Sequence, residues 1–122
     1  MTQEELKNID LEIRDLVEAL NTIPFLKTTC SCCGHNKVPI RIWFNINANQ
    51  INNILFYFFN NLDPKIWSIK ISTLDPNKKG IQVNCYLESG YFVSEMQKEI
   101  EKLTKHIKTI STKYETDKIF YI

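Results

Sequence analysis

The sequence lacks both a long hydrophobic run and an excess of charge of one sign. No stretch approaches the roughly 18 consecutive apolar residues that a membrane-spanning helix requires, so we expect no membrane partner. Lys and Arg number 15 and Asp and Glu number 14, for a formal net charge of +1. Proteins that bind bulk nucleic acid usually carry a basic excess. This balance therefore argues against a bulk nucleic-acid partner and leaves room for a site that binds one small anion.

Other signals are also scarce. The chain has 122 residues with only 3 glycines, and no repeat, linker or low-complexity stretch divides it, so a single domain over residues 1–122 is expected. The first residues, MTQEELKNIDLEIRDL, are acidic and amphipathic and lack the basic start and apolar core of a signal peptide. We therefore expect a cytoplasmic protein whose four cysteines are reduced thiols.

Hydrophobic periodicity predicts three helices and two β-hairpins. Apolar residues at intervals of three and four predict helices over residues 6–20, 50–62 and 93–110. Alternating patterns predict strands at 25–33, 38–46, 66–74 and 81–88. The fold class is therefore expected to be α+β: an antiparallel or mixed four-stranded sheet, made of two hairpins, with three helices packed mainly on one face. Ile100, Leu103 and Ile107 are expected to face the sheet.

The last residues form a separate feature. Residues 111–122 begin as a polar stretch and end in the apolar sequence IFYI. An apolar terminus of this kind gains by burial, so we expect an added edge strand or a contact that makes a homo-oligomer.

The residues with the most reactive chemistry are concentrated within 28–44. Cys30 and Cys33 have the C-x-x-C spacing and His35 follows closely, and thiolate and imidazole are preferred zinc ligands. A structural zinc site needs further ligands, however, and Cys85 and His106 are isolated in the sequence. We therefore expect no metal and no other cofactor, with the thiols packed as small apolar groups.

A nucleophilic cysteine with a histidine base is another interpretation of the same stretch. Cys33 and His35 are too close in sequence to face each other along a strand, although a loop could bring them together. No known nucleophile signature surrounds them. We therefore expect no catalytic residue here.

Ligand binding by the polar side of the first hairpin is the third interpretation. Alternation over 38–46 places Arg41 and Trp43 on the same side, opposite the apolar residues. A guanidinium beside an indole can bind a phosphate and stack a base, whereas the competing interpretation is an ordinary solvated sheet face. The predicted ligand-binding set is Thr28, Thr29, Cys32, Gly34, His35, Asn36, Lys37, Arg41 and Trp43.

The segment Thr28-Thr29-Cys30-Ser31-Cys32-Cys33-Gly34-His35 resembles the Thr-Thr-Ser-Ser-Cys-Ser-Gly-Arg signature of the wybutosine-synthesis methyltransferase family. In that family the signature also follows a helix and opens a strand. Cys30 and Cys33 stand in place of serines and His35 in place of the arginine. The resemblance implies a shared strand-and-turn scaffold, and it makes an enzyme that acts on RNA or a nucleotide one alternative function.

A second resemblance covers more of the chain. Cys32-Cys33-Gly34-His35-Asn36-Lys37, followed by Arg41-Ile42-Trp43-Phe44, is similar to small uncharacterised proteins of phages and their bacterial hosts. This resemblance implies the cytoplasm of a bacterial host. By analogy with other small phage proteins, it also implies an anti-defence protein that sequesters a nucleotide signal.

The leading hypothesis is thus a non-enzymatic binder of a small anionic, nucleotide-like ligand. The alternatives are the enzyme just named and a protein–protein interaction module. One observation separates these functions best: whether Arg41, Trp43 and His35 line one concave pocket, which both the binder and the enzyme would require.

Overall fold

The computed structural model describes residues 2–60, 62–78 and 80–117, with side chains as far as Lys113. Its centre is a four-stranded antiparallel sheet in the order β1-β2-β4-β3. The strands are β1 (Leu26–Cys32), β2 (Arg41–Asn47), β3 (Trp67–Asn77) and β4 (Gly80–Ser89). The two predicted hairpins are therefore confirmed, and β2 and β4 lie side by side at the centre of the sheet.

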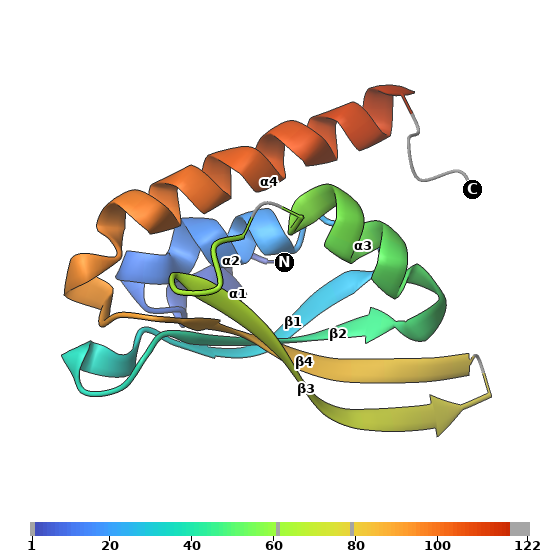
Figure 1. Cartoon of the computed structure of the whole chain (residues 1–122), viewed down its shortest axis with the longest axis horizontal. Helices are drawn as coiled ribbons and strands as arrows, with labels where there is room; N and C mark the ends of the chain where they lie inside the picture. The colour runs from blue at the N-terminus through green and yellow to red at the C-terminus, as the bar shows by residue number, and fades with distance from the viewer. Residues whose placement is uncertain (1, 61, 79, 118–122) are drawn as a thin grey trace.

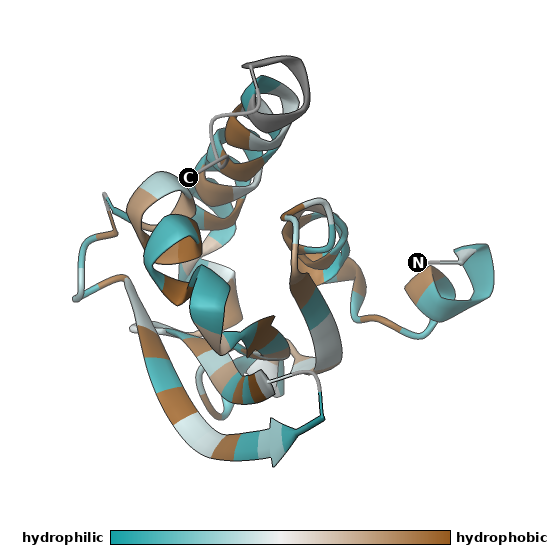
Figure 2. Ribbon diagram, turned by 90° about the vertical axis from the view of Figure 1, so that its right-hand side faces the viewer, coloured by the Kyte–Doolittle hydropathy of each residue, from teal (hydrophilic) through white to brown (hydrophobic). Residues whose placement is uncertain are grey.

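Three helices cover one face of this sheet, as Figure 1 shows. They are α2 (Arg14–Leu20), α3 (Ile51–Phe58) and the long α4 (Gln97–Asp117). Short 3-10 turns occur at Leu11–Ile13, Gly34–Asn36, Ala48–Gln50 and Val93–Glu95. Seen from the side in Figure 2, the helices stand on one side of the sheet, and no described helix covers the other side. The predicted α+β architecture is therefore confirmed.

Alternation along the central strands separates the two faces of the sheet. In β2, the buried residues Ile42, Phe44 and Ile46 alternate with the more exposed Arg41 and Trp43. β4 follows the same rule, with Val83, Cys85 and Leu87 buried. Successive side chains of a strand point to opposite faces, so one face of the sheet forms the floor of the core and the other faces outward.

The core lies between the sheet and the helical layer. As predicted, Ile100, Leu103 and Ile107 of α4 are buried, because residues at intervals of three and four share one side of a helix. α4 packs mainly along α2 and also contacts α3. None of the helices in the described residues is long and apolar enough to cross a membrane.

The predicted first helix is wrong over its first half. Instead of one helix over 6–20, the structure has a short α1 (Gln3–Lys7), a break at residues 8–10, a 3-10 turn and then α2. Thr2 caps α1 by accepting a hydrogen bond from the Glu5 amide over 3.1 Å. The break coincides with a tertiary contact, since the Asp10 carboxylate accepts a hydrogen bond of 2.8 Å from the Cys33 amide. Asp10 accordingly has a non-helical backbone, with φ at −51° and ψ at 130°.

The end of the chain also differs from the prediction. Residues 111–117 continue α4, so this part of the expected tail is helical and forms no edge strand. The remaining residues, including the apolar 119–122 expected to make an oligomer contact, lie outside the described residues.

Candidate functional site

The residues predicted to bind a ligand are divided between two places. Trp43 lines a shallow hollow on the outward face of the sheet, and neither Arg41 nor His35 lines it. His35 lies instead in the turn after β1, beside Asp10 and Cys32. In the part of the chain that the structure describes, Trp43 and His35 therefore belong to two different places, and the hollow at Trp43 does not include Arg41.

Several predicted residues have structural hydrogen bonds. Thr28 is tied to α2, because Asn21 Nδ2 donates to its hydroxyl over 2.7 Å and its own amide donates to Asn21 Oδ1 over 3.1 Å. The Asn36 side-chain oxygen accepts from the Ser94 amide over 3.0 Å, which holds the turn against the segment before α4. Lys37 is exposed.

The outward face carries an aromatic pair. Trp43 on β2 and Tyr86 on β4 are direct cross-strand partners, with ring centroids 4.3 Å apart and planes tilted by 39°. Both residues are only partly buried. The Arg41 guanidinium carbon lies 5.6 Å from the centroid of the Tyr86 ring, within the range of a cation–π contact. One cation and two rings therefore form a continuous surface.

One carboxylate organises the charges beside this pair. Glu88 accepts a hydrogen bond from Arg41 Nε over 2.6 Å and another from Lys70 Nζ over 2.8 Å. The hydrogen bond from Lys70 is the main reason that the pKa of Glu88 is lowered, and the same bond raises the pKa of Lys70. Two cations share one anion, so the group is net positive. The remaining N–H groups of the guanidinium are still potential donors.

A bulge opens the surface next to Trp43. The register of β1 and β2 shifts between Thr28 and Cys30, and bulges of this kind redirect side chains. A shallow hollow of about 380 Å³ lies there, lined by Thr29, Cys30, Trp43, Phe44, Asn45 and Asn84. Asn84 Nδ2 donates to Thr73 Oγ1 over 2.7 Å, which orients its amide. The hollow thus offers a ring, a thiol and two side-chain amides.

Sequence reasoning missed Tyr86, Lys70 and Asn84 as parts of this surface. Alternation over 81–88 does place Asn84 and Tyr86 on one side of their strand. It does not show that this strand pairs with β2, because the neighbouring strands β2 and β4 are not consecutive in the chain.

The turn after β1 brings four reactive groups together. Asp10, Cys32 and His35 each offer a ligand atom, and these atoms all lie within 4.8 Å of one another. The Cys33 sulfur lies 3.5 Å from His35 Nδ1. The bend of the turn therefore allows a contact between Cys33 and His35 that a strand would prevent.

Electrostatics in this turn favour an ionised aspartate and a protonated Cys33. The hydrogen bond from the Cys33 amide lowers the pKa of Asp10, whereas burial raises the pKa of the Cys33 thiol. A thiol must ionise to act as a nucleophile, so the burial of Cys33 argues against covalent catalysis at this position.

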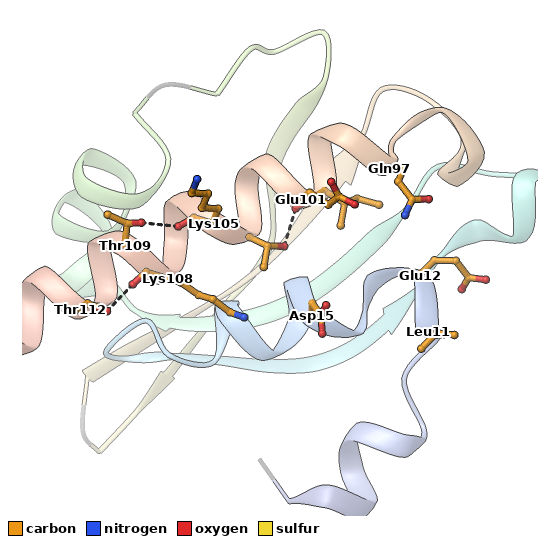
Figure 3. A pocket seen from close by; sticks show the side chains of 11 residues that line it. Leu11, Glu12, Asp15, Gln97, Glu101, Lys105, Lys108, Thr109 and Thr112 are labelled. Atoms are coloured by element: carbon orange, nitrogen blue, oxygen red, sulfur yellow. Dashed lines mark hydrogen bonds between the residues drawn. The ribbon is translucent and has the colours of Figure 1, made fainter.

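Two further cavities contain none of the predicted residues. A groove of about 650 Å³ lies between α4 on one side and, on the other, α2 with the 3-10 turn Leu11–Ile13. Figure 3 shows that carboxylates and lysines line this groove. The Thr109 and Thr112 hydroxyls in that groove donate to backbone carbonyls of α4, those of Lys105 and Lys108. Acidic and basic groups are mixed along the groove, so it does not favour a ligand of either charge.

The other cavity, of about 290 Å³, lies between α3, α4 and the start of β3. Trp67 Nε1 and His106 Nε2 are buried and have no hydrogen-bond partner among the described residues. A water molecule with two to four polar partners commonly satisfies such atoms, so this cavity by itself does not indicate a ligand.

Comparisons of the chain with protein-family models, with curated proteins and with solved structures find no match.

Proposed function

We propose that this protein binds a nucleotide-like ligand on the outward face of its sheet, without catalysing a reaction. The observation that carries the proposal is the Trp43–Tyr86 pair, partly exposed on the two central strands and flanked by Arg41 and Lys70. Bases stack on aromatic side chains irrespective of their identity, because every base has a π-face. An anion is favoured by the net positive group around Glu88.

Phosphate recognition would come from Arg41 and Lys70. Their side chains are half-exposed, whereas the Glu88 carboxylate between them is mostly buried. Glu88 thus holds both cations in place before a ligand arrives, which lowers the entropy lost on binding. Arg41 still has free N–H groups for a phosphate oxygen, and a planar guanidinium can bind it in a bidentate manner.

The hollow beside Trp43 would hold the edge of the base. Asn45 and Asn84 are cross-strand partners, and each side-chain amide has both a donor and an acceptor. A base that stacks on Trp43 would therefore meet hydrogen-bonding groups at its edge. This arrangement uses none of Gly34, His35 and Lys37, which were also predicted to bind the ligand and lie in or directly after the turn that follows β1.

Calorimetry against mono-, di- and cyclic nucleotides tests the proposal. We expect Trp43→Ala to weaken binding about 5- to 150-fold, which corresponds to a stacking contribution of roughly 1–3 kcal/mol. Arg41→Lys should weaken binding nearly as much as Arg41→Ala, because lysine lacks the planar fork. Phe56→Ala is the matched control, since Phe56 is an exposed aromatic residue of α3 on the helical side of the molecule. The proposal fails if no nucleotide binds more tightly than about 1 mM, or if Trp43→Ala and Phe56→Ala bind alike.

A second candidate function, self-association, is favoured by an apolar patch on the β3–β4 hairpin. Ile71 and Leu74 are 63% and 62% exposed, and Ile81 is 45% exposed. The register places Ile71 opposite the buried Cys85, and Leu74 opposite the buried Val83, so these side chains lie on the helical side beyond the cover of the helices. β3 is also an edge strand, and an exposed edge can pair with the same strand of a second copy.

Sedimentation of the wild type and of Leu74→Lys tests this candidate. A lysine on the edge should convert a dimer to a monomer, whereas Lys98→Ala on α4 should leave the dimer intact. A wild-type protein that stays monomeric at high concentration rules out the dimer.

A further inference from the structure

We propose that the turn after β1 is a binding site for zinc, with Asp10, Cys32 and His35 as ligands and the Cys33 sulfur as the fourth. This site adjoins the outward face of the sheet, because Cys32 is the cross-strand partner of Arg41, but its ligands are none of the residues on which the nucleotide proposal rests. It differs from the C-x-x-C site considered for the sequence, because Cys30 is on β1 opposite Trp43 and Asp10 supplies a ligand from a distant segment.

The donor set is the first argument. The three ligand atoms already lie within 4.8 Å of one another. With zinc–nitrogen and zinc–sulfur bonds of about 2.0–2.3 Å, ligand atoms at neighbouring corners of a tetrahedron are about 3.5 Å apart. The observed 3.5 Å between the Cys33 sulfur and His35 Nδ1 matches that edge. The Cys33 thiol contacts His35 and also interacts with the Asp10 carboxylate, so it is the nearest further donor beside the cluster of three ligand atoms.

Backbone geometry is the second argument. Gly34, His35 and Asn36 have φ values of 79°, 52° and 59°, and such left-handed conformations are costly for residues other than glycine. Gly34 is required here for a further reason, since a Cβ would lie 2.8 Å from the Pro39 carbonyl oxygen. Glycine, asparagine and histidine tolerate a left-handed backbone better than most residues, so the local sequence permits this turn, which brings His35 back toward Cys33.

Supporting hydrogen bonds are the third argument. The Gly34 amide donates to the Cys32 sulfur over 3.3 Å, a contact that stabilises a thiolate. The Cys33 amide orients the Asp10 carboxylate, and the Ser94 amide holds Asn36. Partners that orient metal ligands in this way strengthen metal sites. The sulfur and nitrogen donors favour zinc over magnesium or calcium, which prefer oxygen ligands.

The proposed ion would fasten the N-terminal segment to the first hairpin. Asp10 lies at the break between α1 and α2, Cys32 is the last residue of β1, and Cys33 and His35 lie in the turn that follows. A metal that binds only the folded chain stabilises the fold. The bound ion should therefore raise the melting temperature.

Zinc titration against a chromophoric chelator, with the full chain under reducing conditions, tests the inference. We expect one ion per chain. Asp10→Asn, Cys32→Ser and His35→Gln should each weaken binding by more than the roughly 10- to 100-fold that the loss of an outer partner causes. Asp10→Asn keeps an oxygen that can accept from the Cys33 amide, so it tests the ligand rather than the fold. Cobalt in place of zinc should show a thiolate-to-metal charge-transfer band that Cys32→Ser weakens and Cys33→Ser also weakens.

Cysteine alkylation followed by mass spectrometry provides the internal control. Zinc should protect Cys32 from alkylation and leave the exposed Cys30 reactive. Cys85 should stay unreactive throughout, because burial raises the pKa of its thiol to about 11. Absence of saturable 1:1 binding would overturn the site, and so would a Cys30→Ser variant that loses as much affinity as Cys32→Ser. A Cys33→Ser variant with full affinity and an unchanged cobalt spectrum would remove Cys33 from the ligand set.

Discussion

The two faces of the sheet are built from the same strands but meet different requirements. On the covered face, Ile42, Phe44 and Leu87 are fully buried, and their identities follow from the need to fill a core. On the outward face, Trp43 and Tyr86 are immediate sequence neighbours of these buried residues and stay partly exposed. No described helix packs on that face, so filling a core does not explain the rings. The comparison shows why the outward face is the better guide to function.

The largest effect should come from the covered face. Leu87→Ala should lower the free energy of unfolding by about 2–5 kcal/mol, because it removes a fully buried side chain and leaves a cavity. Urea denaturation followed by circular dichroism measures this loss. A change below about 0.5 kcal/mol, the size of a typical surface substitution, would show that this face is not the core.

Ser89, a polar residue at the end of the covered face, should give the next largest effect. Its hydroxyl accepts from the Ile40 amide over 2.8 Å and donates to the Tyr91 carbonyl over 2.7 Å. Ser89→Ala leaves a buried amide without a partner, at a cost of about 1–3 kcal/mol. The control is Ser68→Ala on the outward side of β3, which should cost much less in the same denaturation experiment. Equal losses in the two variants would contradict the assignment of faces.

Tyr86 and Leu87 are sequence neighbours on opposite faces of β4, so substitutions at these two positions compare the two faces directly. Tyr86→Ala should cost less stability than Leu87→Ala, because the ring is only partly buried; the loss combines about 0.5–1.5 kcal/mol for the aromatic pair with a share for the buried part of the ring, and the variant should also bind nucleotide more weakly. Leu87→Val, measured alongside, should lower stability and leave the affinity of the folded protein unchanged. If Tyr86→Ala destabilises the fold as much as Leu87→Ala, then the outward rings serve the fold and not a ligand.

The smallest effect should be the pH dependence of the stability that the ion pairs of Glu88 with Arg41 and Lys70 contribute. Hydrogen bonds from Lys70 and Arg41 lower the pKa of Glu88 in the folded state below its ordinary value of 4.5. The stabilisation from these ion pairs is therefore fully present above that value and is lost as the pH falls through the folded pKa. Because both cations are half-exposed, solvent screens these ion pairs and their contribution is small, so the melting temperature of Glu88→Gln should differ only slightly from wild type at neutral pH.

Thermal melts of the wild type and of Glu88→Gln below pH 4.5 measure the difference between their melting temperatures. This difference should shrink as Glu88 becomes protonated. Asp10 has a lowered pKa as well, so the comparison with Glu88→Gln is needed to isolate Glu88. If the difference in melting temperature grows as the pH falls, then the ion pairs of Glu88 do not stabilise the fold in the way expected here.

Local patterns predicted the strands and the buried side of the last helix because those features depend on the period of the apolar residues. The same patterns failed for the first helix, where residues 8–10 leave the helix and Asp10 binds the Cys33 amide. That contact joins residues far apart in the sequence, and no local rule contains it. The apolar spacing over 6–20 was therefore compatible with a longer helix than the one that forms.

The order of residues is enough to assign side chains to a face, because strand and helix periods are properties of the local backbone. Arg41 and Trp43 were placed together in that way. Their neighbours on that face depend on tertiary packing, since the pairing of β2 with β4 brings Tyr86 and Glu88 to the same surface. Tertiary packing also decided that Asp10 meets Cys32 and His35. Both outcomes depend on which segments lie side by side, and that choice is made by the packing of the whole chain.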